Sequence, residues 1–150
     1  MADAAAAWQA GQAADKEVPM IADRIIEQGT LTSQDGRAAV EVRIPWYRAL
    51  PGSCIAGAAL TVDGVAAPEE SLRWTMNNRT FTFAELVDQT GEWWFPLDSA
   101  VLSGDLPLSD PQADHEVRVD LKLYIPYIIT DHGVLHIEEH DTKTMKVAQR

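Results

Sequence analysis

Apolar and polar residues alternate along several short stretches of this chain, which is the period of a β-strand with one buried and one solvated face. The clearest alternation spans residues 115–124, with apolar side chains at Val117, Val119, Leu121 and Leu123. A second spans residues 39–44, through Val40, Val42 and Ile44. Each pattern predicts a strand that packs one face on a core.

Turn signals separate further predicted strands. The pairs Asp35-Gly36, Asp63-Gly64 and Asn77-Asn78 are residue types that adopt the left-handed conformation of tight hairpin turns. Strands are expected over residues 20–32 (with Gly29 at a bulge), 60–62, 74–76, 79–83 and 93–97, and a polar loop over residues 103–114. Thr82 and Glu85 have the spacing of a capping box for a helix over residues 83–88. Short strands without long helices between them predict an all-β fold, an antiparallel β-sandwich or jelly-roll-like arrangement with one short helix.

The chain divides into an alanine-rich beginning and one domain. Residues 1–18 are expected to be a flexible N-terminal extension, and residues 19–150 a single β-sandwich domain. The first charged residue is Asp3, and Gln9 and Gly11 interrupt the apolar run, so the N-terminus lacks the pattern of a secretory signal. No stretch reaches the roughly 18 apolar residues of a membrane span. We therefore expect a cytoplasmic protein.

The charge balance excludes two classes of partner. Asp and Glu number 23 against 12 Lys and Arg, which gives a formal net charge of −11. Nucleic-acid binding depends on clustered cations that displace counterions, and anionic membranes attract the same cations. We expect neither a nucleic acid nor a membrane as partner. The single Cys54 cannot form an internal disulfide, so the fold does not require an oxidising compartment.

The sequence offers no self-sufficient catalytic or metal site. Cys54 has no histidine nearby to act as its base, which favours a buried structural thiol. His132, His136 and His140 would align on a helix, but Gly133 and the run Val134–Ile137 favour an extended segment. There His136, Glu138 and His140 share one face, and ligands at two-residue steps lie too far apart to surround one ion. The neighbouring Glu138-Glu139 pair is expected to be solvated. We predict no catalytic residue and no metal ligand in this chain.

Residues 44–55 are the most distinctive part of the chain. They read Ile-Pro-Trp-Tyr-Arg-Ala-Leu-Pro-Gly-Ser-Cys-Ile and connect two predicted strands. Pro45 and Pro51 restrict the backbone, so the loop is expected to be stiff. Trp46, Tyr47 and Arg48 are residue types enriched at protein interfaces. The alternative is that these aromatic side chains pack back into the core.

This segment, followed by Leu-Thr-Val-Asp-Gly at residues 60–64, resembles the small beta subunit of C-glycoside deglycosidases. In that family the strand ends in Pro, an aromatic residue, Tyr and Arg, followed by Leu-Pro and Ser-Cys-Ile. The resemblance continues through residues 74–77 (Trp-Thr-Met-Asn) and 83–86 (Phe-Ala-Glu-Leu) and covers residues 20–147, with residues 44–64 as its specific part. The alanine-rich N-terminus departs from the family pattern.

The resemblance implies a role in a complex. The partner in that family is a larger TIM-barrel alpha subunit that carries a divalent metal, expected to be manganese, and the catalytic histidine. It cleaves the carbon–carbon bond between a 3-oxo sugar and an aromatic aglycone such as a flavonoid or an anthraquinone, and the sequence does not specify which aglycone. The chain is then a non-catalytic beta subunit of a heterodimer or a higher αβ oligomer. The residues expected to bind the alpha subunit are Pro45, Trp46, Tyr47, Arg48, Leu50 and Pro51.

Two other functions remain open from the residues alone. A carbohydrate-binding β-sandwich would use exposed tryptophans, and adjacent Trp93 and Trp94 point to opposite faces of a strand, so that one of them is available for stacking on a sugar. An independent barrel enzyme would use His132 or His136. Binding of free sugar by the isolated chain would favour the former, and copurification with a TIM-barrel protein would favour the beta-subunit hypothesis.

Overall fold

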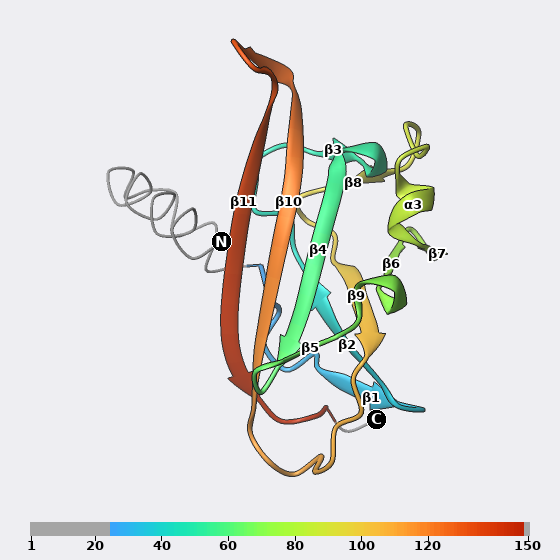
Figure 1. The fold of residues 1–150 in the computed structure, drawn as a ribbon, viewed down its shortest axis with the longest axis vertical. Helices are drawn as coiled ribbons and strands as arrows, with labels where there is room; N and C mark the ends of the chain where they lie inside the picture. The colour runs from blue at the N-terminus through green and yellow to red at the C-terminus, as the bar shows by residue number, and fades with distance from the viewer. Residues whose placement is uncertain (1–24, 149–150) are drawn as a thin grey trace, which may run out of the picture.

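The computed structural model describes residues 25–148, so the predicted extension lies outside the described residues. Two antiparallel sheets face each other across one core (Figure 1). The first sheet has the order β1 (Thr32–Gln34), β2 (Arg37–Val42), β9 (Ala100–Asp105), β6 (Arg73–Met76) and β7 (Arg79–Phe81). The second sheet has the order β11 (Gly133–Met145), β10 (His115–Thr130), β4 (Ile55–Val62) and β5 (Val65–Ala66).

Shorter elements close one end of this arrangement. Strands β3 (Leu50–Pro51) and β8 (Trp93–Trp94) form a two-stranded sheet, and the 3-10 helix η1 (Gly52–Cys54) joins β3 to β4. A second 3-10 helix, η2 (Glu69–Ser71), precedes β6. The α-helix found within residues 25–148 is α3 (Phe83–Leu86). The predicted all-β fold with antiparallel sheets and one short helix is confirmed.

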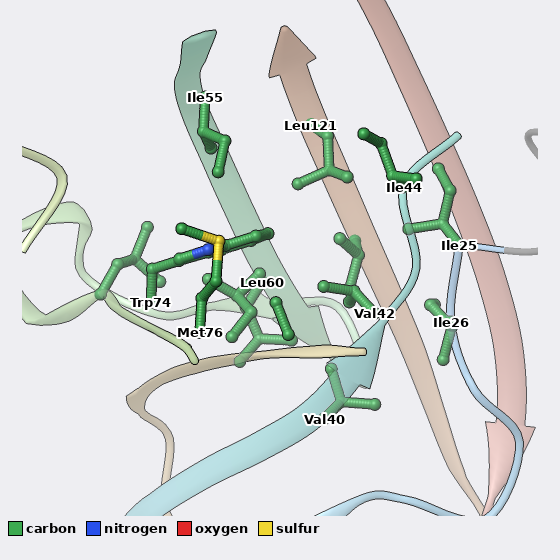
Figure 2. Close-up of a cluster of buried hydrophobic side chains, with 14 of the residues drawn as sticks. Ile25, Ile26, Val40, Val42, Ile44, Ile55, Leu60, Trp74, Met76 and Leu121 are labelled. Atoms are coloured by element: carbon green, nitrogen blue, oxygen red, sulfur yellow. The ribbon is translucent and has the colours of Figure 1, made fainter. Parts of the chain in front are cut away.

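The core lies where the apolar alternation places it. On β10 the side chains of Val117, Val119, Leu121 and Leu123 are all buried. They belong to one hydrophobic cluster with Val40 and Val42 of β2 and with Ile25, Ile26 and Ile44. Figure 2 shows Leu121 of this set together with those residues. Burial of each such aliphatic side chain contributes about 1.5–3 kcal/mol to the free energy of folding. The two-residue period therefore sets which face of each sheet is covered.

The predicted turns are confirmed by their backbone conformation. Asp35 and Gly36 have φ angles of 54° and 78°, Asp63 and Gly64 of 53° and 81°, and Asn77 and Asn78 of 56° and 64°. Two successive left-handed residues match the twist of the strands they join. The capping box of α3 is also present: the Glu85 amide donates to Thr82 Oγ1 (3.1 Å) and the Thr82 amide donates to Glu85 Oε1 (2.8 Å).

The strand predicted over residues 20–32 is wrong within the described residues. Ile26 makes a single bridge to Val42, and β1 begins only at Thr32. Gly29 lies in a turn with φ 81°, not at a bulge. The side chain of Thr30 replaces part of the backbone pairing with β2. Its hydroxyl accepts from the Glu41 amide of β2 (3.1 Å) and donates to the Glu27 carbonyl (2.7 Å).

Several other boundaries differ from the prediction: β4 begins at Ile55, β7 ends at Phe81 and α3 ends at Leu86. Strand β8 ends at Trp94, because the chain turns at once: the Asp98 amide donates to the Phe95 carbonyl (3.0 Å). The polar loop starts after Asp105, since residues 103–105 continue β9 beside β2. Strand β10 extends to Thr130, beyond the alternating segment that predicted it.

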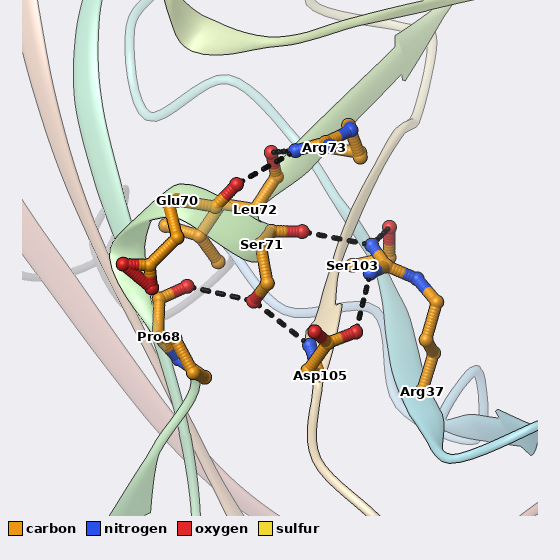
Figure 3. Close-up of polar contacts among 8 residues, drawn as sticks. All are labelled: Arg37, Pro68, Glu70, Ser71, Leu72, Arg73, Ser103 and Asp105. Atoms are coloured by element: carbon orange, nitrogen blue, oxygen red, sulfur yellow. Dashed lines mark hydrogen bonds and ion pairs between the residues drawn. The ribbon is translucent and has the colours of Figure 1, made fainter.

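Polar contacts fix η2 against the first sheet (Figure 3). The Ser71 hydroxyl donates to the Pro68 carbonyl (2.7 Å) and accepts from the Asp105 amide (2.9 Å). Arg37 donates through Nη2 to the Ser71 carbonyl (3.0 Å) and pairs through Nη1 with Asp105 (2.7 Å). These contacts hold the chain before β6 close to the backbone of β9.

This close approach requires a glycine at position 104. A Cβ atom there would lie 2.6 Å from Ala67 Cβ and 3.1 Å from Leu72 Cδ2. We expect Gly104→Ala to lower the free energy of unfolding by about 1–3 kcal/mol through overpacking. The matched control is Gly57→Ala on β4, where a Cβ would meet nothing within 4 Å. Urea unfolding of both variants checks this, and equal midpoints for them would contradict it.

Candidate partner-binding surface

The loop between β2 and β3 is buried at both ends and exposed to solvent in its middle. Ile44 and Pro45 are buried where the chain leaves the first sheet. Leu50 and Pro51 are buried where it pairs with Trp94 and Trp93 of β8. Of the six residues expected to bind a partner, the structure therefore places Pro45, Leu50 and Pro51 inside the fold, where they hold the loop in place.

The other three residues of that set reach the surface. The side chain of Tyr47 is 65% exposed, Arg48 is exposed, and Trp46 is half-buried against the core. The rings of Trp46 and Tyr47 lie 5.0 Å apart at 44°. The alternative that the aromatic side chains pack inward therefore describes Trp46 in part and does not describe Tyr47.

Tyr127 of β10 completes this group, which we call the aromatic cluster: Trp46, Tyr47, Arg48 and Tyr127. Trp46 Nε1 donates to the Tyr127 hydroxyl (2.5 Å), and the Arg48 guanidinium carbon lies 4.7 Å from the centre of the Tyr127 ring. A guanidinium over an aromatic face is held by cation–π attraction of about 0.5–1 kcal/mol at an exposed site. Tyr127 was not among the predicted partner-binding residues, because nothing in its own sequence neighbourhood connects it with residues 46–48.

Further exposed apolar side chains lie in β8 and directly after it. Trp93 is 41% exposed, Phe95 49% and Leu97 84%. The Leu50–Trp94 pair brings Phe95 beside Ala49, and Arg43 Nη1 donates to the Leu97 carbonyl (3.2 Å). These contacts place the segment after β8 next to the chain on both sides of residues 46–48.

The adjacent tryptophans divide as the strand geometry predicts. Trp94 is fully buried, with its ring 4.8 Å from that of Trp74 and its Nε1 donating to the Asp98 carbonyl (3.1 Å). Trp93 faces the surface beside polar groups: Asn77 Nδ2 donates to its carbonyl (3.2 Å) and to Glu92 Oε1 (3.1 Å). One tryptophan of the pair is therefore core and the other is available for contact.

Cys54, the candidate nucleophile, and the buried His115 both lie in surroundings that indicate a structural role. Cys54 is buried, and desolvation raises the pKa of its thiol, which suppresses the reactive thiolate. His115 is buried with Nδ1 2.6 Å from Asp63 Oδ2 and Nε2 2.7 Å from the Asp110 carbonyl. The hydrogen bond to Asp63 raises the pKa of His115 and lowers that of Asp63. Because both ring nitrogens are engaged, His115 links the loop before β10 to the β4–β5 turn.

The histidines of β11 and its turn face outward. His132 and His136 are exposed, and His136 packs edge-on against Tyr124 at 6.3 Å between ring centres. The extended conformation predicted here is confirmed by β11. Within residues 25–148 the structure has no group of three or more His, Cys, Asp or Glu side chains placed to hold a metal ion.

Two carboxylates of β11 instead face inward. Glu139 is only 6% exposed, and desolvation raises its pKa from 4.5 to about 7, so the prediction of a solvated Glu139 is wrong. Asp141, also 6% exposed, accepts from the Ile26 amide (2.9 Å) and from Lys143 Nζ (2.8 Å). Asp141 thereby fastens the segment before β1 to β11.

No helix in the described part of the chain is long and apolar enough to cross a bilayer.

The fold and this surface define a class of protein: a β-sandwich with exposed aromatic and arginine side chains, residue types that are enriched at protein interfaces. Comparison with known proteins gives the family. A family model described as C-glycoside deglycosidase beta subunit matches residues 23–127, well over half of the chain. The chain belongs to this family.

Individual relatives agree with that assignment. A C-glycoside deglycosidase beta subunit from Arthrobacter globiformis is 88% identical over 131 residues, which are 87% of this chain and 100% of the relative. A protein of the same description from Microbacterium trichothecenolyticum is 68% identical over 128 residues, 85% of this chain and 97% of the relative. A 3'-dehydrocarminate deglycosidase beta subunit from a Microbacterium species is 37% identical over 130 residues, 87% and 98% of the two chains. The description of these relatives as beta subunits implies a partner subunit.

Proposed function

We propose that this chain is the non-catalytic beta subunit of a heteromeric C-glycoside deglycosidase, a carbon–carbon lyase that separates a 3-oxo C-glycoside into its aglycone and a sugar product. Membership of the beta-subunit family carries the proposal. The name of one relative specifies a 3'-dehydro substrate, that is, a sugar with a ketone at position 3. The single Cys54, which is free, is compatible with a cytoplasmic complex.

The proposal assigns the chemistry to a TIM-barrel alpha subunit and the binding to this chain. A divalent metal in the alpha subunit, manganese in our proposal, would polarise the sugar ketone. The ketone makes the neighbouring C–H acidic, so that the aglycone can leave by elimination. In this proposal the aromatic cluster contacts the alpha subunit through Trp46, Tyr47 and Arg48, while the buried residues of β3 hold the loop in position. Cys54 and His115 have the structural environments described above, which supports an accessory role.

The decisive experiment compares the chain alone with the complex. We expect no turnover of a 3-oxo C-glycoside by the purified, metal-stripped chain, and turnover when it is combined with the alpha subunit and a divalent metal. Release of the aglycone, followed by chromatography, is the measurement. Turnover by the chain alone would refute the assignment. A bound ion with two or more of His132, His136 and His140 as ligands at about 2.0–2.2 Å would likewise refute the metal-free assignment.

Exposed Trp93 favours a second candidate function, a carbohydrate-binding module. Its indole is 41% exposed, and an exposed ring of this kind stacks on sugars. The Asn77 amide and Glu92 lie beside its backbone, and Arg79 pairs with Glu92 at 2.9 Å. Titration of the isolated chain with glucose and methyl β-glucoside separates the candidates. Binding that is lost in Trp93→Ala would support the carbohydrate module.

A further inference from the structure

The end of the β10–β11 ribbon extends past the sheet to which it belongs. Pairing between β10 and β4 stops at Leu123 opposite Ile55, whereas pairing between β10 and β11 continues to Thr130 opposite Gly133. We call residues 124–135 the arm. Figure 1 shows its tip projecting beyond the labelled strands and helix. The register of β10 and β11 shifts between Ile125 and Ile129, so the arm also departs from the regular ribbon below it.

The arm has an unusual composition for an exposed ribbon. Residues 124–135 contain one charged side chain, Asp131, in a protein in which 23% of residues are charged. Ile129 is 70% exposed, Tyr127 44% and Val134 41%. Natural proteins protect exposed strands with lysines and other charges, and a lone two-stranded ribbon is marginally stable in water. A projecting, nearly uncharged ribbon is therefore expected to be covered by another surface.

We infer that the arm is a second part of the surface that binds the alpha subunit, and this inference rests on the function proposed above. The arm and the β2–β3 loop form one continuous surface, because Tyr127 at the root of the arm accepts from Trp46 Nε1 (2.5 Å) and carries the Arg48 guanidinium over its ring (4.7 Å). A partner that covers Tyr47 and Arg48 also meets Tyr127. The arm then extends along that partner beyond the body of the sandwich.

The alpha subunit fits this surface better than a second copy of the chain. Two copies would each carry a formal charge of −11, and such charge opposes self-association. The exposed parts of Tyr47, Phe95, Leu97, Tyr127 and Ile129 together offer on the order of 600 Å² of mostly apolar surface. A standard interface takes about 800 Å² from each partner and is a little over half apolar, so this surface is large enough for a stable heteromeric contact.

The side chains also define the chemistry of the partner's surface. The arm requires an apolar groove for Ile129 and Val134. Arg48 lies over Tyr127 and makes no hydrogen bond or ion pair with any of residues 25–148, so its guanidinium is free to meet a carboxylate of the partner. An apolar groove with an acidic side chain at its mouth is therefore the expected complement.

The test uses the alpha subunit of the Arthrobacter globiformis relative and a double variant, Ile129→Ser with Val134→Ser. Both side chains are exposed, so the isolated variant should retain its melting temperature within a few degrees. We expect its Kd for the alpha subunit to rise by about 10- to 100-fold, since removal of central apolar contacts costs about 1–3 kcal/mol. The matched control is Val65→Ser on β5, 59% exposed at the end of the molecule opposite the arm (Figure 1).

The outcomes separate this inference from the proposed function. Failure of the wild-type chain to bind or activate the alpha subunit would refute the proposed function and the inference with it. Wild-type binding with equal affinities for the double variant and the Val65→Ser control would overturn the arm assignment alone. A wild-type homodimer that the double variant dissolves, with unchanged affinity for the alpha subunit, would identify a second copy as the occupant.

A measurement without substitutions covers the case in which the double variant unfolds. Hydrogen exchange at the backbone amides of residues 127–134 is compared in the free wild-type chain and in the complex. We expect exchange in the arm to slow at least tenfold on complex formation, while exchange at the β4–β5 turn stays unchanged. Unchanged exchange in the arm of a fully formed complex would overturn the inference.

Discussion

The substitution Tyr47→Ala is expected to weaken binding of the alpha subunit by about 30-fold or more and to lower the activity of the complex, because truncation of a central aromatic anchor typically costs about 2 kcal/mol or more. The side chain is 65% exposed in the free chain, so its loss should change the free energy of unfolding by less than about 0.5 kcal/mol. Arg48→Ala should act in the same direction. Binding affinity by calorimetry and the melting temperature of the isolated chain are the two readouts.

Two control variants define what the Tyr47 result means. Val65→Ala removes a comparably exposed apolar side chain at the opposite end of the molecule, and it should leave affinity and activity unchanged. Arg48→Lys keeps the charge but loses the planar guanidinium, so partial loss of binding would indicate a bidentate contact with a carboxylate. If Tyr47→Ala binds the alpha subunit with normal affinity but has a much lower melting temperature, Tyr47 is a core residue and the interface assignment is wrong.

Trp46 is the weaker choice for this experiment, although it belongs to the same cluster. It packs against the core and donates to Tyr127, so Trp46→Ala removes internal contacts as well as any external one. A lower affinity in that variant would combine a change of fold with a change of interface. The structure therefore narrows the predicted set of six residues to Tyr47 and Arg48 as the informative positions.

The sequence was sufficient where local chemistry decides the structure. The two-residue alternation from Val117 to Leu123 identified the buried face of β10. The Asp-Gly and Asn-Asn pairs identified the turns, because few other residues adopt two successive left-handed conformations at low cost. Thr82 and Glu85 identified the start of α3, because both hydrogen bonds of the capping box form within four consecutive residues.

Contacts between distant segments could not be predicted in this way. The Trp46–Tyr127 hydrogen bond joins residues 81 positions apart and depends on how the two sheets pack. The continuation of β10 through residues 125–130 has no regular alternation and contains Pro126, which argues against a strand unless the residue lies at an edge or an irregularity. The register shift between Ile125 and Ile129 supplies that irregularity, and only the folded chain reveals it.

The burial of Glu139 is the clearest disagreement between local pattern and tertiary structure. The run from His136 to Asp141 is polar and would suit a solvated strand face. In the fold, β11 pairs along its length with β10, and the register Leu121–Glu139 places Glu139 on the side of β10 that faces the core. The pairing of β11 thus imposes burial on a carboxyl group that the residue pattern alone assigns to solvent.

That burial leads to a prediction about pH. Glu139 titrates near its ordinary value of 4.5 in the unfolded chain, and desolvation raises its pKa to about 7 in the folded chain. The folded state therefore holds the proton more tightly than the unfolded state, and stability falls as the pH rises from about 4.5 through about 7. The ionised carboxyl then costs the folded state on the order of 3 kcal/mol.

We therefore expect Glu139→Gln to stabilise the protein by less than about 1 kcal/mol at about pH 5 and by about 3 kcal/mol at about pH 8, because glutamine is the uncharged isostere of the protonated side chain. Glu138→Gln is the matched control, since Glu138 is exposed on the opposite face of β11 and should show no such dependence. His115, whose pKa is raised by Asp63, also makes stability fall as the pH rises, but both variants keep His115 and its contribution cancels between them. Urea unfolding of the two variants and the wild type across this pH range is the measurement. A constant difference between Glu139→Gln and wild type would show that Glu139 does not change its charge in the folded chain over that range.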